Sequence, residues 1–238
     1  MKRYITLIMT FLLVIVPNNP RAEIEGYDIV AKSSKENITL YAKKINDLYY
    51  DFKLDFKGEL YSRPFWINVA NNITYAPQIY YEDINKDKKK ELIIILNQGY
   101  GTGILQQEVY VYGYTNGLND VLVDNPLAII YKNVKTKLST DKAEIKIGDK
   151  VYKVDITPLK IKPTNLFEDI AFGGVTKYEV KDHQLIATIS GQISPAGFVG
   201  QFVIVYEYRD KMYQAKSIEF QPSPELRYIN YRSSLVED

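Results

Sequence analysis

The stretch YYDFKLDFKGEL, residues 49–60, decides the fold class of this chain. Apolar side chains alternate in it with charged ones. The apolar positions are Tyr50, Phe52, Leu54 and Phe56, and the charged positions are Asp51, Lys53, Asp55 and Lys57. Because successive side chains of a β-strand point to opposite faces, this alternation predicts a strand with one buried face and one charged face. Half-buried strands are typical of antiparallel sheets, so we expect the charged positions to form a ladder exposed to solvent.

Short turns separate this strand from its neighbours on both sides. Residues 38–45, ITLYAKKI, predict a strand that joins it through Asn46-Asp47, and Gly58 marks a turn into the next segment. Similar turns follow at Asn116-Gly117, Gly148-Asp149, residues 181–183 and Arg209-Asp210. Strands at this spacing predict an all-β, antiparallel architecture of roughly ten strands built from hairpins, either a sandwich or barrel-like.

Helical periodicity is weak, so we expect a mainly β chain with at most one or two short helices. The best candidate is NLFEDIAF, residues 165–172, in which Asn165 would be the N-cap. Large β domains commonly exceed 200 residues, so residues 23–238 are expected to form a single β-rich domain. The polar stretch KNVKTKLSTDK, residues 132–142, is the expected place of a seam if the chain has two closely packed halves.

The N-terminus predicts export. Lys2 and Arg3 precede an apolar run over residues 4–16, which is the layout of a secretory signal peptide. The run is too short to cross a bilayer, which favours a signal peptide over a membrane span. We assign the signal peptide to residues 1–22, with Ala22 as the expected last residue before cleavage. The mature chain is then secreted, extracellular or associated with the cell envelope, with no membrane span. Its composition, which lacks cysteine, suggests a bacterial origin.

Charge excludes one class of partner. Residues 1–22 hold three of the 30 basic side chains and no acid, which leaves 27 basic and 29 acidic side chains in the mature chain. A nucleic-acid partner would require a basic stripe, so none is expected. We expect a protein or polysaccharide partner at the cell surface, whose identity the residues do not specify.

The sharpest chemical signal is DINKDKKKELIIIL, residues 83–96. Calcium accepts six to eight oxygen ligands, and side chains at alternating positions of a tight loop can converge on one ion. The candidate ligands are Asp83, Asn85, Asp87, the backbone carbonyl of Lys89, and Glu91. An EF-hand is excluded, because its twelfth loop position would be Ile94 and because the flanking segments predict strands.

Residues 83–92 resemble the calcium loop of FG-GAP/VCBS-type repeats, D-x-N-x-D-G-x-x-[DE]-[LI]. The resemblance implies a bound Ca²⁺ between two strands, in a module of extracellular binding or adhesion proteins. It departs from the pattern at Lys88, where the repeats have glycine, and only one copy is present. Lysines at 86 and 88–90 also weaken the attraction for a cation. The alternative is a solvated turn in which Asp and Asn make local hydrogen bonds.

Other candidate sites have simpler interpretations. NQGYGTGIL, residues 97–105, predicts a glycine-rich hairpin rather than a phosphate loop, because no helix follows it. His183, the single histidine, is expected in a surface turn, and no cysteine is available as a nucleophile. Tyr110, Tyr112 and Tyr114 share one strand face, either in the core or, with Trp66, as an exposed aromatic stripe.

Three functions are consistent with these features. The first is an exported, non-catalytic β-rich binding or interaction protein, stabilised by calcium. The second is a structural envelope or coat component that associates with itself. The third is a secreted hydrolase that works through two carboxylates, as glycosidases do. Catalysis is the least favoured of the three, and no catalytic residue is assigned.

Overall fold

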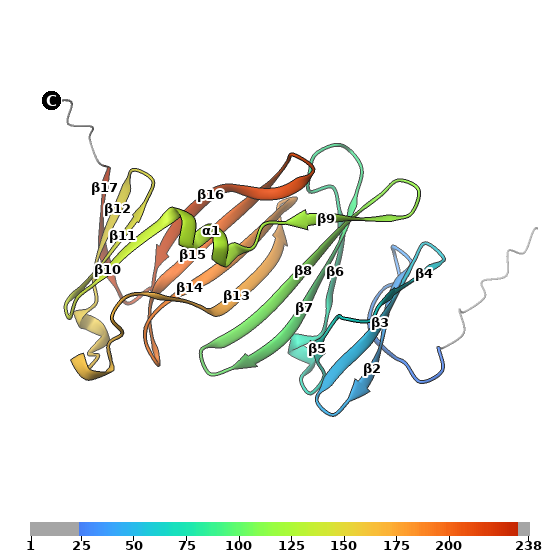
Figure 1. Cartoon of the computed structure of the whole chain (residues 1–238), viewed down its shortest axis with the longest axis horizontal. Helices are drawn as coiled ribbons and strands as arrows, with labels where there is room; N and C mark the ends of the chain where they lie inside the picture. Colours follow the sequence, from blue (N-terminus) through green and yellow to red (C-terminus); the bar gives the residue numbers. More distant parts are fainter. Residues whose placement is uncertain (1–23, 233–238) are drawn as a thin grey trace, which may run out of the picture.

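The computed structural model describes residues 24–232, and the expected signal peptide lies outside them. The described chain is mainly β, with one α-helix and three short 3-10 helices, which confirms the predicted fold class. Its strands form three sheets. Figure 1 shows the largest sheet in the middle of the molecule, with a smaller sheet at each end.

The first sheet contains the strand with alternating apolar and charged residues. Its members are β1 (Asp28–Ser33), β2 (Ile38–Ile45), β3 (Leu48–Phe56), β4 (Glu59–Arg63) and β5 (Asn68–Val69). Asn46-Asp47 and Lys57-Gly58 form the two-residue turns on either side of β3, as expected. Asn46 and Gly58 both have positive φ, which tight hairpin turns require and which these residue types tolerate.

The eight-stranded sheet is barrel-like. Its strands are β6 (Gln78–Glu82), β7 (Glu91–Gly101), β8 (Ile104–Tyr114), β9 (Leu118–Val123), β13 (Ala171–Lys181), β14 (Gln184–Ser194), β15 (Gly197–Arg209) and β16 (Met212–Pro222). Short parallel pairings of β8 with β13 and of β9 with β16 close six of these strands into a ring, in the order β8, β13, β14, β15, β16, β9. All other pairings are antiparallel hairpin pairings, as the turns predict.

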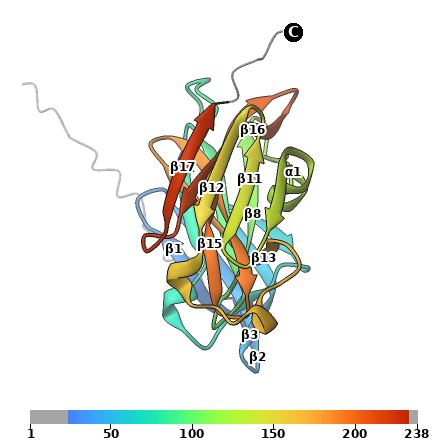
Figure 2. The same ribbon diagram turned by 90° about the vertical axis from the view of Figure 1, so that its left-hand side faces the viewer.

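The third sheet and the helix lie beside the ring. Strands β10 (Val134–Leu138), β11 (Lys142–Ile147), β12 (Lys150–Asp155) and β17 (Arg227–Arg232) form this sheet. The helix α1 (Pro126–Asn133) connects β9 to β10. Figure 2 shows α1 next to the edge of this sheet that β11 and β10 form. The 3-10 helices are Ile73–Tyr75, Thr157–Leu159 and Pro163–Asn165.

The predicted helix over residues 165–172 is wrong. Asn165 ends the 3-10 helix Pro163–Asn165 instead of capping an α-helix, and Ala171 begins β13. The Phe167 backbone N–H donates to the Ile193 carbonyl at 2.9 Å, so tertiary hydrogen bonding replaces local helix bonding. The true helix is α1, where the Asn125 side chain accepts from the backbone N–H groups of Leu127 and Ala128.

Strand β7 is buried on both faces and separates two hydrophobic cores. Ile93 and Ile95 point into the core of the ring, whereas Leu92, Ile94 and Leu96 point into the core against the first sheet. All five are 0% exposed, which explains why this strand is a continuous apolar run rather than an alternating one. The polar stretch 132–142 contains the end of α1, the strand β10 and the turn into β11.

The tyrosines of β8 belong to the core. Tyr112 is 1% exposed, and Trp66, at 4% exposed, stacks on Tyr110 with ring centroids 4.5 Å apart. The ring of Tyr114 packs edge-on against Phe56. Core packing, rather than an exposed aromatic stripe, is therefore the role of this face. The charged face of β3 also departs from a simple solvent ladder, since Asp55 is 5% exposed.

Candidate functional site

The predicted calcium loop connects β6 to β7, as strand–loop–strand geometry requires. Its side-chain oxygens accept backbone N–H groups of the loop itself. Asp83 accepts from Lys86 at 2.7 Å and from Lys88 at 3.0 Å. Asn85 accepts from Asp87 at 2.8 Å, and Asp87 from Lys89 at 2.7 Å. The three side chains therefore fold back over the loop they belong to.

Two lysines adopt left-handed backbone angles in this loop. Lys86 has φ 68° and Lys88 has φ 69°. This conformation costs a residue with a Cβ roughly 1–2 kcal/mol, and Lys88 is the position where the resembling repeats have glycine. Lys88 thus holds a backbone angle that glycine would adopt without strain.

Glu91 closes the loop from the first position of β7. Its Oε2 accepts the Ile84 backbone N–H at 2.9 Å, and its Oε1 accepts the Asn85 side-chain amide at 2.8 Å. The residue is 4% exposed, and desolvation raises the pKa of its carboxyl above the usual 4.5. Since both oxygens accept hydrogen bonds from the loop, the Glu91 side chain connects the start of the loop to the start of β7.

A cleft of about 450 Å³ lies next to the loop, between it and the ends of β8, β9 and β16. Asn85, Asp87 and Glu91 line one side of it, and Asp120 and Tyr213 line another. Three lysines also line it: Lys89, Lys90 and Lys211. Tyr213 is 1% exposed, and its phenolic oxygen has no hydrogen-bond partner among the described residues. Burial, followed by the nearby Glu91 carboxylate, raises the pKa of Tyr213. A buried hydroxyl without a partner is costly, so this position favours an occupant that offers an oxygen.

The donor set of the loop fits a calcium ion in kind. Each carboxylate oxygen has two lone pairs, so an oxygen that accepts one N–H can still bind a cation. Within residues 24–232, however, no three His, Cys, Asp or Glu side chains are gathered closely enough to hold a metal ion. A calcium ion here would therefore need the Asn85 side chain and the Lys89 carbonyl as well as the acids. Calcium at this loop stays a prediction.

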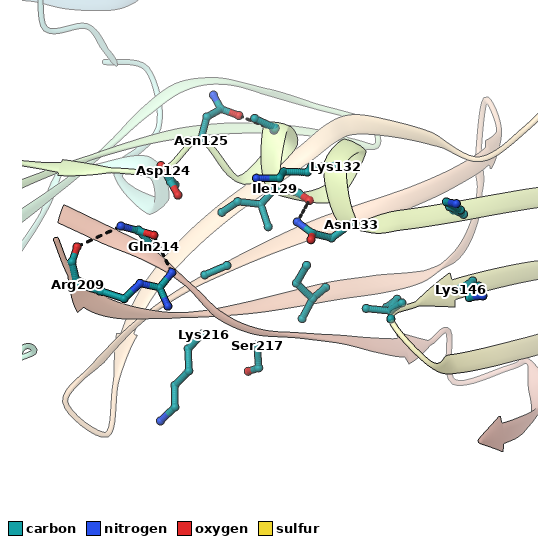
Figure 3. A pocket seen from close by; sticks show the side chains of 16 residues that line it. Asp124, Asn125, Ile129, Lys132, Asn133, Lys146, Arg209, Gln214, Lys216 and Ser217 are labelled. Atoms are coloured by element: carbon teal, nitrogen blue, oxygen red, sulfur yellow. Dashed lines mark hydrogen bonds between the residues drawn. The ribbon is translucent and has the colours of Figure 1, made fainter. Parts of the chain in front are cut away.

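A second and larger cleft was not found by sequence reasoning. It has a volume of about 760 Å³ and lies between α1, the strands β10 and β11, and β16. Four lysines from these elements line it: Lys132, Lys135, Lys146 and Lys216. Figure 3 shows Lys132 on the helix, Lys146 on β11, and Lys216 on the β16 side, where its side chain extends away from the helix. The lysines are far apart in sequence, so no local motif marks this cleft.

Charge in this cleft is unbalanced. None of the four lysines has an ion-pair partner among the described residues, and Asp124 is the only carboxylate among the lining residues described. The fifth basic group, Arg209, is neutralised by Glu207 at 3.2 Å and Asp210 at 3.7 Å. Arg209 also donates to the Gln214 side chain at 2.7 Å, as the dashed line in Figure 3 indicates.

The remaining candidates lie where their simpler interpretations place them. Residues 97–105 form the hairpin between β7 and β8, with a bulge between Asn97 and Gly99. His183 lies in the β13–β14 turn with its side chain 70% exposed, and its Nδ1 is 3.3 Å from a Glu82 carboxylate oxygen.

Comparison with protein-family models, with curated proteins and with solved structures found no match to this chain. In the described part of the chain, no helix is both long and apolar enough to cross a membrane.

Proposed function

We propose that this chain is an exported, non-catalytic binding protein whose loop 83–91 is stabilised by a calcium ion. The observation that carries the proposal is the buried, partnerless hydroxyl of Tyr213, a residue that lines the same cleft as Asn85, Asp87 and Glu91. It is independent of the sequence motif, and it lies beside the same loop. A calcium ion with its bound water would supply the missing oxygen.

Repulsion among the three acids of the loop supports the same assignment, against the opposing charge of the lysines at 86 and 88–90. Asp83, Asp87 and Glu91 carry like charges within one short loop, and Asp83 and Asp87 both raise the pKa of Glu91 after the larger effect of burial. A divalent cation would compensate this repulsion. The Asp and Asn side chains bind backbone N–H groups, so the loop is already shaped before an ion arrives. The ion would then stabilise the connection between β6 and β7. The apolar residues of β7 pack into both hydrophobic cores, so this connection bears on the stability of each.

The melting temperature of the purified protein tests the proposal. Extracellular calcium sites have dissociation constants near 10⁻⁴ M, so about 10 mM calcium would stabilise the fold by roughly 2.7 kcal/mol relative to excess EDTA. For a chain of this length the expected rise is on the order of 5–10 °C. An unchanged melting temperature would contradict the calcium site.

A conservative variant separates calcium binding from damage to the loop. Asp87→Asn keeps an oxygen for the Lys89 N–H but removes a charge, so we expect it to melt like the wild type in EDTA and to lose most of the calcium response. The matched control is Asp182→Asn in the β13–β14 turn, which also removes one charge from a tight turn and should leave the calcium response intact.

A further inference from the structure

We propose that the cleft between α1, β10–β11 and β16 binds a ligand that carries two or more phosphate-type groups. This inference names the ligand class of the binding function proposed above and rests on that function, but it does not depend on the calcium ion. It is carried by the placement of the unpaired lysines in the strands that form the cleft.

The pairing of β10 with β11 puts two lysines directly opposite each other. Lys135 faces Lys146 across the strands, and both line the cleft. Side chains so placed have Cβ atoms about 4.5–5.5 Å apart, and like charges there are destabilising. The next pair on the same face, Lys137 opposite Glu144, has complementary charges and lies outside the cleft. The unfavourable pair therefore occurs where an anion could bind between its members.

Lys216 lies at a β-bulge on the rim of the cleft, with its side chain extending away from α1 (Figure 3). Val205 pairs with Ser217 and Tyr206 pairs with Ala215, so Lys216 is the additional residue of β16 at that point. Bulges redirect a side chain and are frequent beside binding sites. Protection of a sheet edge would explain lysines on the edge strand β10. It does not explain Lys146, which is on an inner strand, or Lys216, which is in the other sheet.

The lining also indicates which anion fits. None of the described residues that line the cleft is aromatic, so it offers no ring on which bases could stack. Its lysines are compact, hydrated charges, and lysine binds phosphate as a point charge, whereas Arg209 is already paired. Its volume of about 760 Å³ is within the range of small-molecule sites. A compact polyphosphate or a segment of a phosphate-bearing polymer meets these conditions.

Calorimetric titration of the purified protein in EDTA at low salt tests this inference. The probes are inorganic phosphate, tripolyphosphate, long-chain polyphosphate and a single-stranded oligonucleotide. We expect tripolyphosphate to bind at least about tenfold more tightly than inorganic phosphate. Its affinity should fall as salt is added, because salt screens the charges. Stronger binding of the long chain would indicate a polymer, and equal binding a compact ligand. Tighter binding of the oligonucleotide, or no binding of either polyphosphate, would overturn the inference.

The variant Lys146→Glu gives opposite effects on binding and on stability. Replacing the like-charged pair by a complementary one should raise the melting temperature by up to about 4 °C. The same substitution should lower the affinity for tripolyphosphate at least about tenfold. Lys216→Ala should lower the affinity for tripolyphosphate without raising the melting temperature. The control Lys32→Glu makes the same charge change on an exposed residue of β1 and should alter the affinity less than about twofold. Unaltered affinity in Lys146→Glu would overturn the inference, whereas a calcium response in the same protein would leave the calcium-stabilised function in place.

Discussion

Lys88 shows at the scale of one residue how a side-chain hydrogen bond holds the loop 83–91 in a backbone conformation that lysine disfavours. It has φ 69°, and its backbone N–H donates to Asp83 at 3.0 Å. This hydrogen bond between side chain and backbone holds a loop whose backbone conformation a lysine does not itself favour. The strain is local, because the next lysine along, Lys89, does not have a positive φ. Substitutions at these two positions should therefore have opposite effects.

Lys88→Gly is expected to stabilise the calcium-free protein by about 0.5–1 kcal/mol, since glycine adopts positive φ at no steric cost but gains freedom in the unfolded chain. It should also strengthen calcium binding by removing a nearby positive charge. Lys89→Gly should destabilise the protein by a similar amount. Urea unfolding measures both, and equal effects of the two substitutions would contradict this account of the loop.

Glu91 makes stability depend on pH in a definite direction. Its pKa is raised above 4.5 in the folded state by burial, so between that value and its folded pKa the folded chain holds a proton that the unfolded chain has released. Stability contributed by this group is therefore lost as pH rises through that window. Calcium needs the ionised carboxylate, so it should oppose this loss. We expect the stabilisation by calcium to grow as pH rises from 4.5, and urea unfolding with and without calcium measures it. A calcium effect that falls with rising pH would contradict the role of Glu91.

At the scale of elements, β7 connects the two cores. Its alternate residues pack into opposite cores, so each face should contribute separately to stability.

The predicted strands, hairpin turns and calcium-loop position follow from local patterns such as the alternation in residues 50–57 and the turn residues Asn46 and Gly58. The helix α1 was missed because its eight residues are too few to show a clear helical period, although Asn125-Pro126 is a helix-start signal. Residues 165–172 were misassigned because the Phe167 backbone N–H bonds to the carbonyl of Ile193 in a distant strand.

Ile93→Ala and Ile94→Ala test this role of β7. Both residues are 0% exposed but lie in different cores, so each substitution should cost roughly 2–5 kcal/mol. A single unfolding transition in urea that both variants shift would indicate one cooperative domain. Two transitions, each shifted by only one variant, would indicate two units instead of the single domain expected from the sequence.

At the scale of the whole molecule, two clefts lie at different places on one β framework. The candidate calcium loop could be located from the sequence because its candidate ligands lie within nine consecutive residues, 83–91. The basic cleft could not, because it gathers lysines from one helix and two sheets that only the folded chain brings together. Strand register supplies the missing information, since Lys135 meets Lys146 only through the β10–β11 pairing. The proposed function combines the two sites: a calcium-stabilised framework and a separate surface that binds a ligand.

Direct titration of calcium into the purified protein tests the central claim most closely. The account predicts one calcium ion per chain, with a dissociation constant on the order of 10⁻⁴ M, and loss of most of that binding in Asp87→Asn. No heat of binding, or binding that is the same in Asp87→Asn, would contradict it and leave DINKDKKKE a lysine-rich turn.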